Sequence, residues 1–164
     1  MFYRFGKLIL IPLLLGVTTV QGQSESDVSM SIEVLVDSMN VRPKPMLILI
    51  TTDWCKFCRI QKAQLKKNKE FKNASNSFYF AELNAESKQK ISFNGKDYHY
   101  KSTGLSTGIH ELAIELGNQK TGVSYPTWVL LDPQYRVLLK HTGVLNTKEL
   151  QLMLNAIEKM RSEL

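Results

Sequence analysis

An unbroken run of apolar residues, Met46 to Ile50 in MLILIT, constrains the fold of this chain more than any other feature. A strand with one solvent-exposed face alternates apolar and polar residues, whereas a strand covered on both faces is a continuous apolar run. Residues 46–51 therefore predict a central strand in a sheet with helices on both faces. The chain's 164 residues, 43% of them hydrophobic and 22% charged, suffice for one ordinary globular domain of this kind.

Helices are predicted in four segments, where apolar residues recur at helical spacing. These are residues 29–40, one long segment from the cysteines to about residue 74, residues 107–116 and residues 146–160. Gly117 is expected to close the third helix. Asn146 and Glu149 form a capping-box pattern at the start of the fourth.

Further strands are predicted at residues 78–84 and in the segments SYPTWVLLD (124–132) and YRVLLKHTG (135–143). Asn94-Gly95 lies between two alternating runs and predicts a hairpin within an insert of about residues 88–106. The order of elements implies a right-handed parallel crossover, with an antiparallel pair added at one edge. The predicted class is therefore α/β, with a central mixed sheet flanked by helices.

The first 22 residues are typical of a secretory signal peptide. Arg4 and Lys7 precede an apolar run that ends at Val20, and small residues up to Gly22 provide a cleavage site. The run is shorter than the roughly 20 residues of a membrane-spanning helix, which leaves an uncleaved anchor as the alternative. We expect a signal peptide at 1–22, a polar linker at 23–28 and one domain at 29–164 of a periplasmic or secreted protein.

The formal net charge is +6, and many of the basic residues follow the cysteines. No Gly-rich or aromatic surface that could bind bases accompanies them. A solvated helix face is therefore expected, and a nucleic-acid partner is not.

The chain has two cysteines, Cys55 and Cys58, in a C-x-x-C pair directly after the central strand. A disulfide across so short a loop restrains little of the unfolded chain, which argues against a structural clip. Cys55 would lie in the first turn of a helix, where unpaired N–H groups stabilise an anion, with Lys56 and Arg59 nearby. Such surroundings lower a thiol pKa from about 8.5 to roughly 3.5–7.5, so Cys55 is the predicted nucleophile and Cys58 the resolving thiol.

The two cysteines have two alternative roles, as zinc ligands or as inert core residues. A zinc site needs four ligands, and the histidines available to complete it, His99, His110 and His141, have no ligand spacing and are expected at the surface or a sheet edge. Two inert core cysteines are the second alternative. The helix-start position and the exported context favour a reactive pair, with no metal or small-molecule cofactor.

Three segments together resemble the thioredoxin superfamily. TDWCKFC follows an apolar strand, SYPT precedes a later strand, and HTGVLNTKEL lies near the end of the chain. Within the superfamily the chain is most similar to exported bacterial members related to the C-terminal domain of the disulfide interchange protein DsbD. The resemblance implies a thioredoxin fold over residues 29–164, with a β-hairpin inserted between the second strand and the cis-proline strand.

The resemblance also implies roles for residues around the dithiol. Pro126 matches the family's cis-proline, which faces the dithiol and leaves the preceding backbone free to pair with an extended substrate. Its neighbours Tyr125 and Thr127 are therefore the expected substrate-binding residues, and Trp54 would cap the active site. The alternatives are the start of an edge strand for Pro126 and a core position for Trp54.

The proton relay is a departure from the family pattern. Thioredoxins have a buried aspartate six residues before the first cysteine, where this chain has Leu49. Glu82, at the position of the family's partner lysine, is the candidate catalytic base, with Asp53 as a second candidate. For both residues the alternative is a plain surface carboxylate. The dipeptide between the cysteines, Lys56-Phe57, leaves the direction of electron flow open.

These inferences predict an exported thiol:disulfide oxidoreductase that reduces or isomerises protein disulfides. The expected partners are protein disulfide substrates and a membrane-embedded dithiol electron donor, with no stable membrane insertion after signal cleavage. One rival is a thioredoxin-fold binding module whose insert docks a partner and whose dithiol is incidental. Another is a peroxide-reducing enzyme, but residues 47–55 lack the proline of its Pro-x-x-x-Thr-x-x-Cys pattern.

Overall fold

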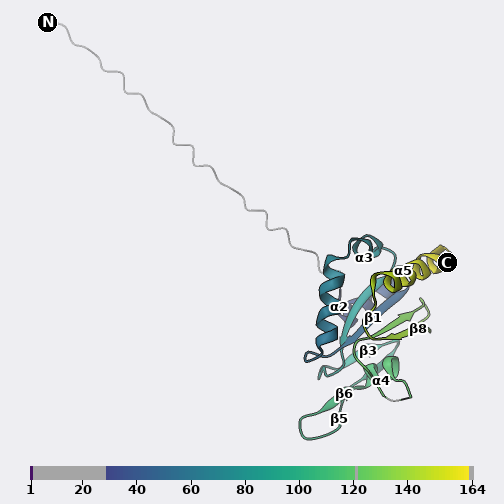
Figure 1. The fold of residues 1–164 in the computed structure, drawn as a ribbon. Helices are drawn as coiled ribbons and strands as arrows, with labels where there is room; N and C mark the ends of the chain where they lie inside the picture. Colours follow the sequence, from purple (N-terminus) through teal and green to yellow (C-terminus); the bar gives the residue numbers. More distant parts are fainter. Residues whose placement is uncertain (2–28, 121, 163–164) are drawn as a thin grey trace.

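The computed structural model describes residues 1, 29–120 and 122–162, and Figure 1 shows how their elements are arranged. The predicted signal peptide (1–22, apart from Met1) and linker (23–28) lie outside the described residues. In the described part of the chain, no helix is both long and apolar enough to cross a membrane.

A four-stranded mixed sheet forms the centre of the domain, in the order β2-β1-β7-β8. Strand β1 (Met46–Thr51) pairs in parallel with β2 (Tyr79–Asn84) and antiparallel with β7 (Thr127–Leu131), which in turn pairs antiparallel with β8 (Val137–Thr142). All residues of β1 are buried. The prediction of a central strand covered on both faces is confirmed.

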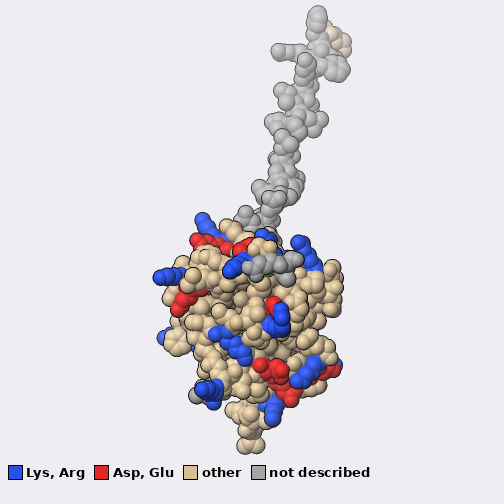
Figure 2. Space-filling model, turned by 90° about the vertical axis from the view of Figure 1, so that its right-hand side faces the viewer, with Lys and Arg blue, Asp and Glu red and all other residues tan. Residues whose placement is uncertain are grey.

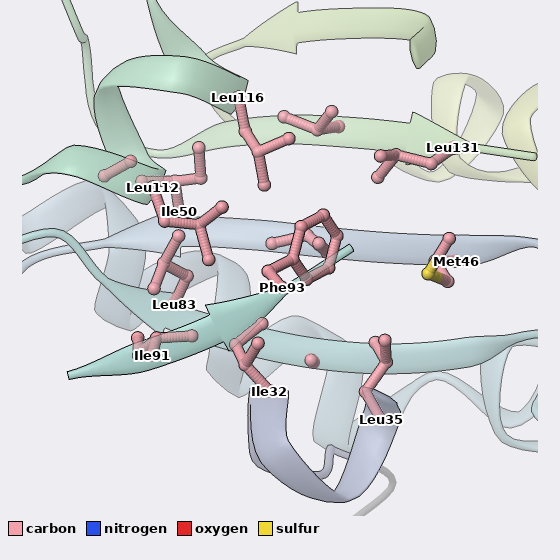
Figure 3. Packing of buried hydrophobic residues seen from close by; sticks show 14 of the residues in the cluster. Ile32, Leu35, Met46, Ile50, Leu83, Ile91, Phe93, Leu112, Leu116 and Leu131 are labelled. Carbon is pink, nitrogen blue, oxygen red and sulfur yellow. The ribbon is translucent and has the colours of Figure 1, made fainter. Parts of the chain in front are cut away.

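Helices cover both faces of this sheet, and alternate side chains of β1 belong to separate cores. Ile48 and Ile50 join a cluster with α1 (Ile32–Val41) and α4 (Glu111–Gly117). Figure 3 shows Ile50 among the leucines of this cluster. Leu47 and Leu49 join the opposite cluster, whose helices are α2 (Lys56–Lys67), α3 (Lys69–Ala74) and α5 (Thr147–Ser162). The α/β thioredoxin fold expected from the sequence is thus the observed one.

The prediction of one long helix after the cysteines is wrong, because the helix is interrupted at Asn68, which separates α2 from α3. Asn68 leaves the helical conformation, and its side-chain carbonyl accepts a hydrogen bond from the Phe71 N–H at 2.8 Å. It therefore caps the start of α3, a position that asparagine favours. The break lets the buried Phe71 ring reach Phe78 and Phe80.

Helix α4 begins four residues later than the predicted 107, because residues 108–110 form strand β6 and His110 caps the helix. Gly117 is the last helical residue, and the following Asn118 keeps a negative φ of −63°. A Cβ atom on Gly117 would lie 2.7 Å from Cδ1 of Ile50. The glycine is therefore needed for close packing on β1, and not for the left-handed cap that the sequence suggested.

The insert extends to His110, beyond the predicted 106, and contains two antiparallel pairs where one hairpin was predicted. Strands β3 (Ile91–Phe93) and β4 (Lys96–Tyr98) meet at Asn94 and Gly95, whose φ values of 49° and 73° fit a type I′ turn. Strands β5 (Tyr100–Ser102) and β6 (Gly108–His110) form the second pair. Both pairs are separate sheets, so neither extends the edge of the central sheet.

The last helix, α5, begins as predicted. The Asn146 side chain accepts from the Glu149 N–H at 3.0 Å, and the Glu149 carboxylate accepts from the Asn146 N–H at 2.8 Å. This reciprocal capping box is confirmed, and α5 packs its apolar side over the sheet face that also carries α2.

Candidate active site

The dithiol lies where β1 ends and α2 begins. Cys55 is the N-cap of α2, and its Sγ accepts a hydrogen bond from the Cys58 N–H at 3.0 Å. The two cysteines are joined by a disulfide, with their Cα atoms 5.3 Å apart, and both are buried. The first turn of α2 has no acidic residue. In the reduced protein, the same N–H and the helix dipole would stabilise a thiolate on Cys55.

Pro126 and its neighbours lie at the same end of the sheet, where β7 begins next to the end of β1. The Tyr125–Pro126 peptide bond is cis, as the resemblance implies. The Pro126 carbonyl accepts from the Gly143 N–H at 2.8 Å, and the buried Thr127 hydroxyl donates to the Ser124 carbonyl at 2.7 Å. Among the described residues, no backbone hydrogen bond involves Tyr125. Its backbone is thus available to an extended ligand.

Trp54, just before α2, contacts Tyr125, just before β7, so the cysteine segment and the Pro126 segment meet at these two rings. Trp54 is 64% exposed, so the core position considered from the sequence is wrong. Its ring meets Tyr125 edge-to-face, with centroids 5.9 Å apart, and its indole N–H donates to the Glu86 carboxylate at 3.0 Å. Burial raises the pKa of Tyr125, and the Glu86 charge raises it further, which keeps the phenol neutral.

Glu86 is a site residue that the sequence reasoning missed. It lies two residues after the end of β2, and parallel pairing places the end of β2 beside the end of β1. That topology was the available signal, because residues after parallel neighbours gather at one edge of a sheet.

The carboxylate predicted as a catalytic base, Glu82, lies on β2 opposite Leu49 in the register. Leu49 is buried, so the departure from the family's aspartate leaves an apolar side chain on the central strand. The Glu82 carboxylate forms a partly exposed ion pair with Lys62 of α2 at 3.2 Å. Its catalytic role stays a prediction. The alternative, Asp53, is exposed and accepts a hydrogen bond from Asn84 at 3.2 Å.

Gln61 is a second residue that the sequence reasoning missed. It is fully buried on α2, one turn after Cys58, and its carbonyl accepts from the Leu145 N–H at 2.6 Å. Leu145 is two residues beyond Gly143, which donates to the Pro126 carbonyl. Gln61 therefore ties the cysteine-bearing helix to the loop that holds Pro126. Its position on the same helix face as Cys58 and Leu65 was a usable signal.

Thr52 contributes a buried hydroxyl that has no hydrogen-bond partner among the described residues. Its carbonyl accepts from the Cys55 N–H at 3.3 Å, so Thr52 belongs to the turn that leads into the dithiol. A buried polar atom left unpaired beside a reactive pair is unusual, because burial without a partner is costly.

One of the three histidines contradicts the expectation of surface or edge positions. His110 is fully buried; its Nδ1 accepts from the Leu112 N–H at 3.2 Å, and its Nε2 lies 3.0 Å from the Gln89 carbonyl. It anchors the insert to α4. Among the described residues, no group of three His, Cys, Asp or Glu side chains lies close enough to hold a metal ion.

Comparison with known proteins agrees with this geometry. The family model described as a thioredoxin-like domain matches residues 36–158. A search of curated proteins finds no match.

Three solved structures illustrate what the chain is similar to at low identity. Deadhead, a germline-specific thioredoxin from Drosophila melanogaster, is 16% identical, with a TM-score of 0.50 over 77% of this chain and 95% of its own. A thioredoxin-fold protein from Helicobacter pylori is 20% identical, with a TM-score of 0.45 over 84% and 91%. The oxidoreductase DsbH is 15% identical, with a TM-score of 0.48 over 96% and 95%. At such identities the likeness concerns the fold alone. By its family match and its C-x-x-C disulfide, the chain belongs to the thioredoxin-like domain family and is a thiol-disulfide oxidoreductase.

Proposed function

We propose that this oxidoreductase is exported and that it reduces or isomerises disulfides of other proteins. The observation that carries the proposal is the Cys55–Cys58 disulfide at the start of α2, with the Cys58 N–H directed at the Cys55 sulfur. This arrangement favours a thiolate at Cys55 over one at Cys58, because the helix N-terminus stabilises the negative charge.

The proposed reaction begins with the reduced dithiol. The Cys55 thiolate attacks one sulfur of a substrate disulfide, which forms a mixed disulfide and releases the first substrate thiolate. Cys58, deprotonated, then attacks the Cys55 sulfur, which re-forms the Cys55–Cys58 bond and releases the second substrate thiolate. Two electrons pass from the enzyme dithiol to the substrate, and the enzyme ends in the disulfide state.

The residues around the dithiol serve binding and proton transfer in this scheme. The backbone at Tyr125, ahead of Pro126, pairs with an extended substrate segment, with Thr127 holding the loop through its bond to Ser124. Trp54 covers one side of the approach to the sulfur atoms. Glu82 is the proposed base that accepts the Cys58 proton.

The source of electrons is the second part of the proposal. A reductase in an oxidising compartment must be recharged, and a dithiol protein embedded in the membrane is the proposed donor. The dithiol itself carries the two electrons, so no small-molecule cofactor is required. A closer relation to the C-terminal domain of DsbD is part of this proposal and rests on the three motif segments.

The test is a redox titration of the protein without residues 1–22 in dithiothreitol or glutathione buffers, followed by trapping of free thiols. A potential of about −270 mV supports a reductase, and one of about −120 mV makes the protein an oxidant. Cys58→Ser is expected to stall as a mixed disulfide, and Cys55→Ser to form none. A dithiol that does not cycle, or a cellular function that survives Cys55→Ser, would favour the binding module instead.

A further inference from the structure

A buried glutamine on α2 links the helix that carries the cysteines to the loop between β8 and α5. Gln61 is fully buried, and its side-chain carbonyl accepts a hydrogen bond from the Leu145 N–H at 2.6 Å. Leu145 is also buried, in the core cluster on the α2 side of the sheet. The hydrogen bond therefore joins two segments that are 84 residues apart in the chain.

The burial of this hydrogen bond determines how much depends on it. Figure 2 shows Lys and Arg side chains among Asp and Glu side chains on one face of the domain, where water surrounds them. Gln61, by contrast, is fully buried, so water does not replace the Leu145 N–H as its partner. A buried polar group that loses its hydrogen bond keeps the full cost of its desolvation. The arrangement in which the two groups meet is therefore favoured over one in which they separate.

The loop after β8 connects this hydrogen bond to the cis-proline. Gly143, two residues before Leu145, donates its N–H to the Pro126 carbonyl at 2.8 Å. Asn146, directly after Leu145, belongs to the capping box of α5. The loop is thus held by Pro126, by Gln61 and by α5. Because a single residue separates Gly143 from Leu145, a displacement of the loop at Leu145 is passed on to Pro126.

On the helix side, the same hydrogen bond fixes the position of the dithiol. Gln61 and Cys58 are both buried on α2, three residues or about 4.5 Å apart along its axis. The Cys58 N–H in turn donates to the Cys55 sulfur at 3.0 Å. The Gln61–Leu145 bond therefore couples two parts of the site that a substrate must contact together, the sulfur atoms and the backbone at Tyr125.

We propose that Gln61 is a positioning residue, which holds the backbone at Tyr125 at the distance from Cys55 that an extended disulfide substrate requires. Such a substrate pairs with this backbone while one of its sulfur atoms meets Cys55. Without the Gln61–Leu145 bond, only a fraction of the molecules have both parts in place, and the apparent affinity falls by that fraction. The inference rests on the proposed function, because it concerns how the same site binds its protein substrates.

The experiment compares Gln61→Met with a matched control, Gln64→Met. Methionine has nearly the length of glutamine but offers no carbonyl to the Leu145 N–H. Gln64 is exposed on the same helix, and its carbonyl accepts from the Gln61 amide at 3.4 Å. The control therefore removes this weaker contact and leaves the bond to Leu145 in place.

Each reduced enzyme is mixed with one of two substrates, and thiols are trapped over time. The first consists of two copies of a short extended peptide joined by one disulfide. The second is bis(2-hydroxyethyl) disulfide, which is too small to pair with the backbone at Tyr125. Single-turnover rates at a series of peptide concentrations give the half-saturating concentration and the maximum rate.

In Gln61→Met, the half-saturating peptide concentration should rise about tenfold, which is the size of effect of one buried hydrogen bond left unmade. The maximum rate, the rate with bis(2-hydroxyethyl) disulfide and the reduction potential of the dithiol should change little, because none of them depends on pairing at Tyr125. Hydrogen exchange of the Leu145 amide should become faster. Gln64→Met should match the unmodified enzyme in all of these measurements.

A second variant, Gly143→Ala, covers the case in which Gln61→Met does not fold. Beyond the chain neighbours of Gly143, a Cβ atom there has no atom of the described residues within 4 Å, but the φ of 101° strains an alanine. The substitution leaves α2 and the core unchanged and loosens the loop from its Pro126 end. It should raise the half-saturating peptide concentration in the same way.

An unchanged half-saturating concentration in Gln61→Met, or in Gly143→Ala if Gln61→Met does not fold, would overturn the role of Gln61. A shifted reduction potential in Gln61→Met would also overturn it, since Gln61 would then act on the sulfur atoms themselves. Failure of the proposed function has a different signature, because the unmodified reduced enzyme would not react with bis(2-hydroxyethyl) disulfide. If the unmodified enzyme reduces both substrates and the variants bind the peptide equally well, only this inference fails.

Discussion

The two hairpins of the insert have strands of equal length but opposite surroundings. In β3–β4, the side chains of Ile91, Phe93 and Tyr98 are buried in the core beside α1. In the second hairpin only the far part, residues 101–107, is exposed, whereas Ile109 and His110 at the end of β6 pack against the domain. A two-stranded hairpin is marginally stable by itself, so burial and not strand pairing makes the first one a part of the scaffold. The second hairpin is left available for contact with a partner.

The largest expected effect is from Phe93→Ala. Its ring is buried and meets Tyr135 edge-to-face at 5.1 Å, so truncation leaves a cavity in the core. We expect a loss of about 3–5 kcal/mol in the free energy of unfolding, measured by urea denaturation. Leu105→Ala in the other hairpin should stay within about 0.5 kcal/mol. Equal losses would contradict the division between a buried and a free hairpin.

Substitution of His110, which joins the start of the insert to α4, should have the next largest effect on the free energy of unfolding. His110→Ala removes the cap of α4 and the contact with the Gln89 carbonyl, and we expect a loss of roughly 2–3 kcal/mol. His110→Asn keeps an acceptor for the Leu112 N–H and should recover part of it. Hydrogen exchange checks whether amides of both hairpins lose protection together. If only β5–β6 were affected, His110 would not be the shared anchor.

A pair of glycines provides a smaller and more local comparison. Gly95 has a φ of 73° in the type I′ turn of β3–β4, so Gly95→Ala should cost about 1–2 kcal/mol. Gly104→Ala in the exposed loop meets only the Thr107 hydroxyl, a side chain that can rotate away. Thermal unfolding should show little change for Gly104→Ala. A larger loss there than at Gly95 would mean that the exposed loop is held more tightly than its exposure indicates.

The smallest expected effect is a pH dependence of β3–β4. Hydrogen bonds from Ser92 and Lys90, together with the Lys90 charge, lower the pKa of Asp97 below its usual 3.8. A lowered folded-state pKa stabilises the protein above the unfolded value, and the contribution disappears as pH falls through the folded value. The free energy of unfolding of Asp97→Asn, measured as a function of pH, should therefore fall less below pH 3.8 than that of the unmodified protein. An identical decline would mean that Asp97 contributes nothing.

Elements with a local signal were predicted well from the sequence. The run at residues 46–51, the Asn94-Gly95 turn and the Asn146–Glu149 capping box each have their cause within a few neighbouring residues. The helix break at Asn68 also had a local signal, since asparagine is a good N-cap, but the continuing amphipathic pattern concealed it.

Errors arose where a contact distant in sequence decided the role of a residue. His110 is polar and looked exposed, yet the insert folds back and buries it against Gln89 and α4. Gly117 looked like a helix cap, but its lack of a side chain serves packing against Ile50.

The sequence by itself determined the position of the dithiol, because a strand, a tight turn and a helix start are properties of adjacent residues. It also determined the class of the fold, because segments with helical spacing of apolar residues and segments typical of strands follow one another in a definite order. Only the tertiary structure decided which groups surround the dithiol: Trp54 and Glu86 are 32 residues apart, and Gln61 and Leu145 are 84 apart. Tertiary structure also decided how much of each hairpin is buried, because both hairpins consist of strands of the same short length. Burial depends on what the rest of the chain places beside a segment, and no local pattern contains that information.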